Sequence, residues 1–158
     1  EIDERLKEMR NIPVFHDDQH GTAIVVLAGI INGLRVTGKK KEDCRVVVNG
    51  AGSAGVAITK LLLTYGFRHV TMCDREGIIG KDYPNLNWMQ QKMTEVTNLE
   101  NKNGTLADAL KGADIFVGVS APNIVTPEMV ASMNHDSILF AMANPVLLRD
   151  GQHRLPKR

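Results

Sequence analysis

Residues 44–55 constrain this chain most, because a short β-branched run, C-R-V-V-V-N, ends directly in the turn G-A-G-S-A-G. Helically spaced apolar residues then run from Ser53 to Tyr65 and stop at Gly66. The pattern G-x-G-x-x-G between a strand and a helix is typical of dinucleotide-binding domains. Its three glycines allow the tight turn, the approach of a pyrophosphate and close helix packing. The predicted phosphate-binding turn therefore comprises Gly50, Ala51, Gly52, Ser53, Ala54 and Gly55.

The rest of the chain alternates in the same way. Further strands are expected at 69–73, 115–119 and 137–142, and further helices at 22–36, 85–96, 105–111 and from 126 onward. Strands separated by helices indicate a parallel sheet, because parallel neighbours need crossover connections. The predicted class is α/β, a Rossmann-like doubly wound parallel sheet with helices on both faces. Helix 22–36 is apolar nearly all round and is expected to be buried. Segments 77–87 and 97–104 are expected to be polar surface loops.

Composition excludes several classes of protein. The chain has 158 residues, a mass of 17.4 kDa and a formal net charge of +1, so no nucleic-acid groove or electrostatic membrane anchor is indicated. No run reaches the ~18 consecutive apolar residues of a membrane span. Cys44 and Cys73 each lie within an apolar run, as reduced core cysteines of a cytoplasmic protein do.

An acid follows the second strand. Asp74 lies twenty-four positions after Gly50, close to the spacing of about 20 residues at which a carboxylate binds the adenosine ribose hydroxyls. Taken alone, Asp74 could be a solvated strand-end carboxylate, but the glycine turn favours nucleotide binding. A carboxylate repels the 2′-phosphate of NADP, whereas the adjacent Arg75 could pair with it. NAD is the preferred prediction, and NADP stays open.

Small and amide residues follow the third and fourth strands. Ser120 and Ala121 lie in G-V-S-A-P-N (118–123), and Asn144 lies in A-N-P (143–145). The prolines could simply end strands and Asn144 could simply cap a turn. Ligands in open α/β sheets, however, bind beyond the carboxyl ends of the strands, where all these residues are expected.

The segment V-F-H-D-D-Q-H-G-T (14–22) concentrates polar groups between two apolar segments. If this segment is extended, Asp17 and Asp18 point to opposite sides and have different partners. One carboxylate could ligate Mg²⁺ or Mn²⁺, and the other could hold a catalytic cation such as a lysine. Zinc bound through His16 and His20 would need ligands that no spacing elsewhere supplies. Equally, the segment could cap the helix that begins at Thr22.

Five strings of sequence together resemble the malic enzyme family in its bacterial form. They are I-P-V-F-H-D-D-Q-H-G-T-A (12–23), V-V-N-G-A-G-S-A-G (47–55), M-C-D-R-E-G (72–77), G-A-D-I-F-V-G-V-S-A-P-N (112–123) and A-M-A-N-P-V (141–146). They occur in the family's order and span nearly the whole chain.

The resemblance implies oxidative decarboxylation of malate to pyruvate and CO₂ with NAD(P) and Mg²⁺ or Mn²⁺. It implies that Asp18 is a metal ligand and that Asp17 orients the catalytic lysine. It places Ser120 and Ala121 beside the nicotinamide and Asn144 near substrate and cofactor. A homo-oligomer is implied for the full-length protein.

The resemblance also predicts how the chain divides. Residues 1–21 match the end of the family's substrate and metal domain, residues 22–146 match its NAD(P)-binding domain, and residues 147–158 form a divergent polar tail with no assigned role. The family's tyrosine and lysine acid–base residues and a Glu-Asp pair of metal ligands precede this region. The chain is therefore expected to be a piece of a longer protein that is inactive alone. Another NAD-dependent dehydrogenase and a non-catalytic nucleotide-binding domain remain the alternatives.

Overall fold

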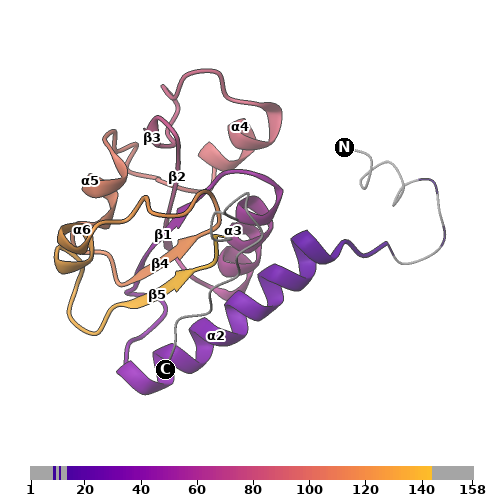
Figure 1. Ribbon diagram of the computed structural model, residues 1–158. Helices are drawn as coiled ribbons and strands as arrows, with labels where there is room; N and C mark the ends of the chain where they lie inside the picture. The colour runs from indigo at the N-terminus through magenta and orange to yellow at the C-terminus, as the bar shows by residue number, and fades with distance from the viewer. Residues whose placement is uncertain (1–8, 10, 12–13, 144–158) are drawn as a thin grey trace, which may run out of the picture.

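The computed structural model describes residues 9, 11 and 14–143, which fold around one five-stranded sheet (Figure 1). The strands are β1 (Arg45–Asn49), β2 (His69–Asp74), β3 (Gly77–Ile78), β4 (Ile115–Gly118) and β5 (Ile138–Ala141). The helices are η1 (Asp17–Gly21), α2 (Thr22–Thr37), α3 (Ser53–Tyr65), α4 (Trp88–Thr94), α5 (Leu106–Leu110) and α6 (Pro127–Ala131). The predicted strands and helices occur in the predicted order, and two elements that were not predicted, η1 and β3, are added to them.

The sheet has the strand order β3-β2-β1-β4-β5, in which β2, β1, β4 and β5 are parallel. The order reverses between β1 and β4, because β2 continues to one side of β1 and β4 starts on the other. This reversal is the topological switch point at which doubly wound sheets bind ligands. The predicted α/β class and parallel sheet are confirmed.

Helices cover both faces of the sheet, as predicted. On one face α2 and α3 pack on Val46 and Val48, and on the other α5 packs on Val47 and Phe116. Successive side chains of a strand point to opposite faces, so the run R-V-V-V-N supplies both cores at once.

The two segments expected to be polar surface loops are partly buried, so that prediction is wrong. Gly77 and Ile78 form an antiparallel edge strand against Cys73 and Asp74. Ile79 is completely buried and donates its amide hydrogen to the Met72 carbonyl. In the second segment Thr97 and Asn98 are buried. The hydrophobic periodicity does not detect β3, because the strand has only two residues and many of its sequence neighbours are polar.

Helix α2 is less buried than its sequence predicts. Ala23, Val26 and Ile30 are buried, but Ile24 and Val25 are 56% and 63% exposed. Residues 19–37 form a helical stretch long and apolar enough to cross a membrane by length and composition, a test that helices of soluble domains also pass. Here α2 packs against α3 and β5 within the domain.

Asp114 connects several segments at the end of the sheet where the parallel strands begin. Its carboxylate accepts hydrogen bonds from the Arg45 amide at 2.9 Å, the Asn134 side chain at 3.0 Å and Lys39 Nζ at 2.8 Å. Burial raises the pKa of Asp114, but these three donors outweigh burial and leave the pKa below its ordinary value. A carboxylate with this many donors fixes the α2–β1 connection against β4 and the α6–β5 turn.

Candidate cofactor site

The turn at residues 50–55 has the geometry that a bound pyrophosphate requires. Gly50 adopts φ +114°, and a Cβ there would come within 3.0 Å of the Val119 backbone. At Gly55 a Cβ would overlap the carbonyl oxygen of Gly50, so no side chain fits between helix and turn. At Gly52 an added Cβ would meet nothing within 4 Å. The three glycines thus differ as the fingerprint predicts: two are required by packing, and one faces open space.

Helix α3 begins at this turn without a capping side chain. Gly52 is its N-cap in an extended conformation, and the first helical hydrogen bond runs from the Val56 amide to the Gly52 carbonyl at 3.0 Å. The amide groups of the first turn have no partner within the helix and carry its positive partial charge. An anion placed over Gly52 would meet these donors directly.

Asp74 ends β2 beside this turn, and its carboxylate is held by two donors. Its Oδ1 accepts the Arg75 amide hydrogen at 3.0 Å, and its Oδ2 accepts a hydrogen bond from Gln90 Nε2 at 3.3 Å. Gln90 is 8% exposed, and its Oε1 accepts the amide hydrogen of Asn87 at the start of α4. The carboxylate therefore has a defined orientation at the strand end.

The sequence prediction missed this role of Gln90. The signal was present as N-x-x-Q (87–90), a capping box in which Asn87 accepts the Gln90 amide hydrogen and Gln90 accepts that of Asn87. The pattern explains why Gln90 lies at the start of a helix. It does not predict that the Nε2 atom of the same side chain donates a hydrogen bond to Asp74, sixteen residues earlier in the chain.

Two adjoining hollows open at the carboxyl ends of β1 and β4. One, of about 450 Å³, includes Asp74, Arg75 and Ser120 among its lining residues. The other, of about 420 Å³, is lined mainly by apolar residues of 116–143. Asn49, Ala121 and Ile124 line both, so the two hollows adjoin at the switch point, and together they are called the cleft below. One hollow is lined by charged and polar side chains and the other mainly by apolar ones. Such a cleft suits a ligand that has both polar groups and flat rings, as a dinucleotide has.

Four of the ten predicted cofactor residues, Asp74, Arg75, Ser120 and Ala121, line this cleft. The glycine turn, Asp74, Arg75, Ser120 and Ala121 all follow the carboxyl ends of β1, β2 and β4. Asn144, predicted to contact substrate, lies outside the described residues. The Cys73 thiol borders the site but is fully buried, and burial together with the Asp74 charge raises its pKa to about 12. A thiol held protonated in this way is a packing group.

The paired aspartates lie in one turn of π-helix, and the predicted extended conformation at Asp17 and Asp18 is wrong. Residues 17–21 continue directly into α2, and no side chain caps α2 at Gly21. Consecutive residues of a helical turn do not point to opposite sides, so that argument for different partners fails. The Asp17 side chain is exposed, and its carboxylate lies against Gly21 where a Cβ would stand. The Asp18 side chain lies outside the described residues.

Aromatic rings hold this turn in place. The Nδ1 atom of His20 lies 3.1 Å from both the amide nitrogen and the carbonyl oxygen of His16, and the His20 ring stacks at 5.3 Å on Phe15. The Nδ1 atom of His16 is buried with no hydrogen-bond partner in the described part of the chain. With one of its ring nitrogens turned to the backbone, His20 serves the turn itself.

The π-helical turn lies at the same edge of the sheet as the cleft. Helix α2 ends just before β1 begins, and its sixteen residues span about 24 Å, enough to place its start at the carboxyl ends of the strands (Figure 1). The turn contacts α3, which itself starts at the glycine turn. Asp17 therefore lies at the end of the sheet where the cleft opens.

No metal site is complete within residues 9, 11 and 14–143. No group of three or more His, Cys, Asp or Glu side chains there could hold a metal ion. Carboxylates are suitable ligands for Mg²⁺ or Mn²⁺, but the described residues offer at most part of a coordination shell.

Comparison with known proteins identifies the domain. Residues 19–152 match the family model described as malic enzyme, NAD binding domain. The chain belongs to the malic enzyme family. An NAD-dependent malic enzyme of Geobacillus stearothermophilus is 52% identical over 148 residues, 92% of this chain and 30% of that protein. An NADP-dependent malic enzyme of Haemophilus influenzae is 47% identical over 146 residues, 91% of this chain and 19% of that protein.

A solved structure agrees with the malic enzyme fold. The NAD-dependent malic enzyme of Thermotoga maritima superimposes with a TM-score of 0.88 at 48% identity, covering 92% of this chain and 39% of that one. The chain thus spans well under half the length of these relatives and corresponds to their NAD(P)-binding domain. The predicted family, fold and class of cofactor are confirmed, whereas the domain boundaries at residues 21 and 146 stay predictions.

Proposed function

We propose that this chain is the cofactor-binding part of an enzyme that oxidises and decarboxylates malate to pyruvate and CO₂. The observation that carries the proposal is the cleft at the β1–β4 switch point, with open space over Gly52 and an oriented carboxylate at Asp74. The relatives named as malic enzymes are much longer, so the remaining catalytic groups belong to other parts of such a protein.

Each part of the cleft has a proposed role in holding the cofactor. The amides of 52–55 bind the pyrophosphate, and Asp74 accepts hydrogen bonds from the adenosine ribose hydroxyls. Ser120 and Ala121 would line the nicotinamide side of the cleft, and a bound cofactor would supply the hydride acceptor there. The apolar lining of the adjoining hollow would exclude water from the nicotinamide.

We propose NAD as the preferred cofactor. Asp74 is fixed by Gln90 and by the Arg75 amide, so its charge lies where a 2′-phosphate would have to fit. The Arg75 side chain is exposed. Among the described residues of the turn between β2 and β3, it is the only positive charge beside Asp74. If NADP binds at least tenfold tighter than NAD, a difference of about 1.4 kcal/mol, Arg75 outweighs Asp74 and the preference is wrong.

Three further roles rest on the family resemblance. Asp17 would orient a catalytic lysine, Asn144 would contact substrate and cofactor, and Asp18 would contribute one oxygen ligand to Mg²⁺ or Mn²⁺. A bound divalent ion supplies a Lewis acid that polarises a ketone. The described residues do not complete its coordination. Asp17 is exposed at the cofactor edge, which suits a residue that contacts another part of the protein.

The test compares this chain with a full-length protein that contains it. The isolated chain should bind NAD in an equilibrium titration and show no turnover of malate, because acid–base groups are missing. The full-length protein should reduce NAD with malate only when Mn²⁺ or Mg²⁺ is added. Steady-state malate oxidation by the isolated chain would contradict the assignment of roles, and metal-independent turnover of the full-length protein would contradict the reaction.

A further inference from the structure

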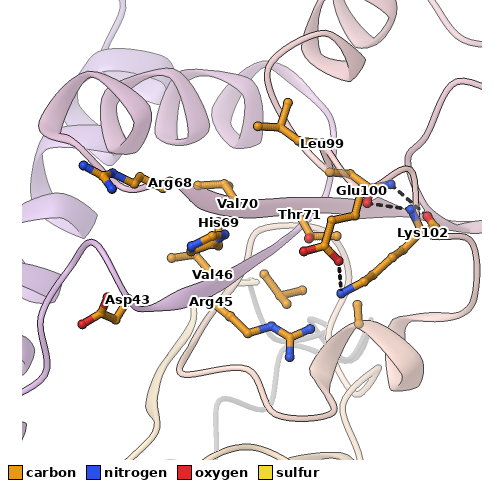
Figure 2. A pocket seen from close by; sticks show the side chains of 13 residues that line it. Asp43, Arg45, Val46, Arg68, His69, Val70, Thr71, Leu99, Glu100 and Lys102 are labelled. Carbon is orange, nitrogen blue, oxygen red and sulfur yellow. Dashed lines mark hydrogen bonds and ion pairs between the residues drawn. The ribbon is translucent and has the colours of Figure 1, made fainter.

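A further hollow, separate from the cofactor cleft, opens at the other end of the sheet, where the parallel strands begin (Figure 2). It has a volume of about 470 Å³ and lies where β1 and β2 begin, under the loop 98–102. Its floor is on the α5 face, because Val47 packs with α5 and Ala109 of α5 is part of the lining. The cofactor residues follow the other ends of the same strands, so the two hollows are separated by the length of the sheet.

Basic side chains outnumber acidic ones in this hollow, which is lined by Arg45, Arg68 and Lys102 and by the acids Asp43 and Glu100. Figure 2 shows the side chains of Arg45 and Lys102 extending into it from different sides, with His69 on β2 nearby. Glu100 also points inward and forms an ion pair with Lys102 at 2.5 Å. Arg45, Lys102, His69 and Glu100, with the floor of β1 and β2, are called the cationic groove below.

The backbone beneath the cations is fixed. The Arg45 amide donates to Asp114, and the Arg45 carbonyl accepts the Asp114 amide hydrogen, each at 2.9 Å. The Lys102 amide donates to Asn98 Oδ1 at 2.9 Å, and Asn98 itself is buried and bonded to the β2 backbone at Val70. Cations on a fixed backbone pay less conformational entropy when a ligand binds.

The Arg45 guanidinium is unpaired in the part of the chain that the structure describes, where no hydrogen bond or ion pair of its side chain is found. The Glu100 carboxylate lines the groove with its side chain 66% exposed, and its pKa is lowered first by the hydrogen bond and charge of Lys102 and then by Arg45 and His69. An oxyanion is thus already stabilised at this position by the chain itself. The planar fork of an arginine suits a carboxylate or a phosphate, with two parallel hydrogen bonds.

We propose that the cationic groove is a binding site for a small multivalent oxyanion, a phosphate or carboxylate compound, separate from the cofactor cleft. The ligand contacts Arg45 and draws Lys102 away from Glu100. The volume exceeds that of a single phosphate ion and fits a compact metabolite with two or more anionic groups. Because the groove touches the starts of β1 and β2, a ligand there contacts the two strands whose other ends carry the glycine turn and Asp74.

The test titrates the 158-residue chain with sodium pyrophosphate and, separately, with citrate, and follows backbone amide resonances. NAD is present at saturation to occupy the cofactor cleft, and chloride holds the ionic strength constant. Shifts are expected at Arg45, Thr71 and Lys102 for pyrophosphate, for citrate or for both, and the response identifies the class of oxyanion. If neither compound shifts these amides, the proposal is wrong. Because these reporters lie outside the cleft, the result stands whether or not NAD binds.

Three substitutions should change the affinity for the oxyanion, two by lowering it and one by raising it. Arg45→Gln and Lys102→Gln should each weaken oxyanion binding roughly three- to fivefold, while Glu100→Gln should strengthen it by a similar factor, because it removes the competing carboxylate. Lys60→Gln, an exposed lysine of α3 on the other face, is the matched control and should change nothing. Equal weakening by Lys60→Gln, or no strengthening by Glu100→Gln, would show general charge attraction and overturn the site.

Discussion

Substitution of Gly52 by alanine separates cofactor binding from folding. The backbone of Gly52, with φ −77° and ψ −171°, is one that alanine adopts without strain. The added Cβ meets no atom within 4 Å in the folded chain. It does occupy the space over the first turn of α3, where the proposed pyrophosphate lies. Gly55→Ala is the contrasting substitution, because its Cβ would overlap the Gly50 carbonyl oxygen and lie 2.9 Å from the carbonyl carbon.

The expected magnitudes differ sharply. Gly52→Ala lowers the entropy of the unfolded chain but loses a favourable N-cap glycine, so the free energy of unfolding should change by less than about 1 kcal/mol. Its dissociation constant for NAD should rise at least tenfold, equivalent to about 1.4 kcal/mol. Gly55→Ala must move backbone against backbone and should lower the free energy of unfolding by about 3 kcal/mol or more.

Urea unfolding followed by circular dichroism measures the first quantity, and equilibrium titration with NAD measures the second. The combination of unchanged stability and lost affinity in Gly52→Ala is the diagnostic result. Unchanged affinity in a stable Gly52→Ala protein would refute the placement of the pyrophosphate. A large loss of stability in that variant would refute the claim that this position faces open space.

Three further predictions follow from individual side chains. Asp114→Ala should lower the free energy of unfolding at pH 7 by about 3 kcal/mol. Because the folded-state pKa of Asp114 is lowered, this difference should shrink progressively as the pH falls below about 4 and through that lowered pKa. Urea titrations that give a pH-independent difference would contradict the role of the charge. Gln90→Glu keeps the capping box but places a second carboxylate against Asp74, so the affinity for NAD measured by titration should fall about tenfold. Gln91→Glu, which adds the same charge at an exposed position, should have little effect. Equal losses of affinity in the two variants would exclude a positioning role for Gln90. Cys73, with its raised pKa of about 12, should resist iodoacetamide in the folded protein and react in urea, as followed by mass spectrometry, and modification under native conditions would show that the strand end opens.

The parts of the fold that the sequence predicted well are those that local chemistry decides. The strand–turn–helix at 45–65 has a β-branched run, a glycine turn and a glycine stop, and the helix begins and ends where predicted. Thr105 and Thr126 cap α5 and α6 through their hydroxyls, at the residues where those helices are expected to begin. In each case the signal lies within a few residues of the structure that it specifies.

Predictions failed where the outcome depends on distant contacts. The two residues of β3 are a strand only because β2 offers a free edge at Cys73 and Asp74. The exposure of Ile24 and Val25 depends on which surfaces α2 meets, and periodicity cannot identify those surfaces. The orientation of Asp74 by Gln90 likewise joins two elements that no short motif connects.

Amide resonances of the chain during an NAD titration show whether the cleft at the β1–β4 switch point holds the dinucleotide. We expect the largest shifts at residues 50–55, at Asp74 and at residues 120–121, with saturation at a single dissociation constant. Saturable NAD binding that leaves these amides unchanged, or that shifts only those at the starts of β1 and β2, would contradict this placement of the dinucleotide.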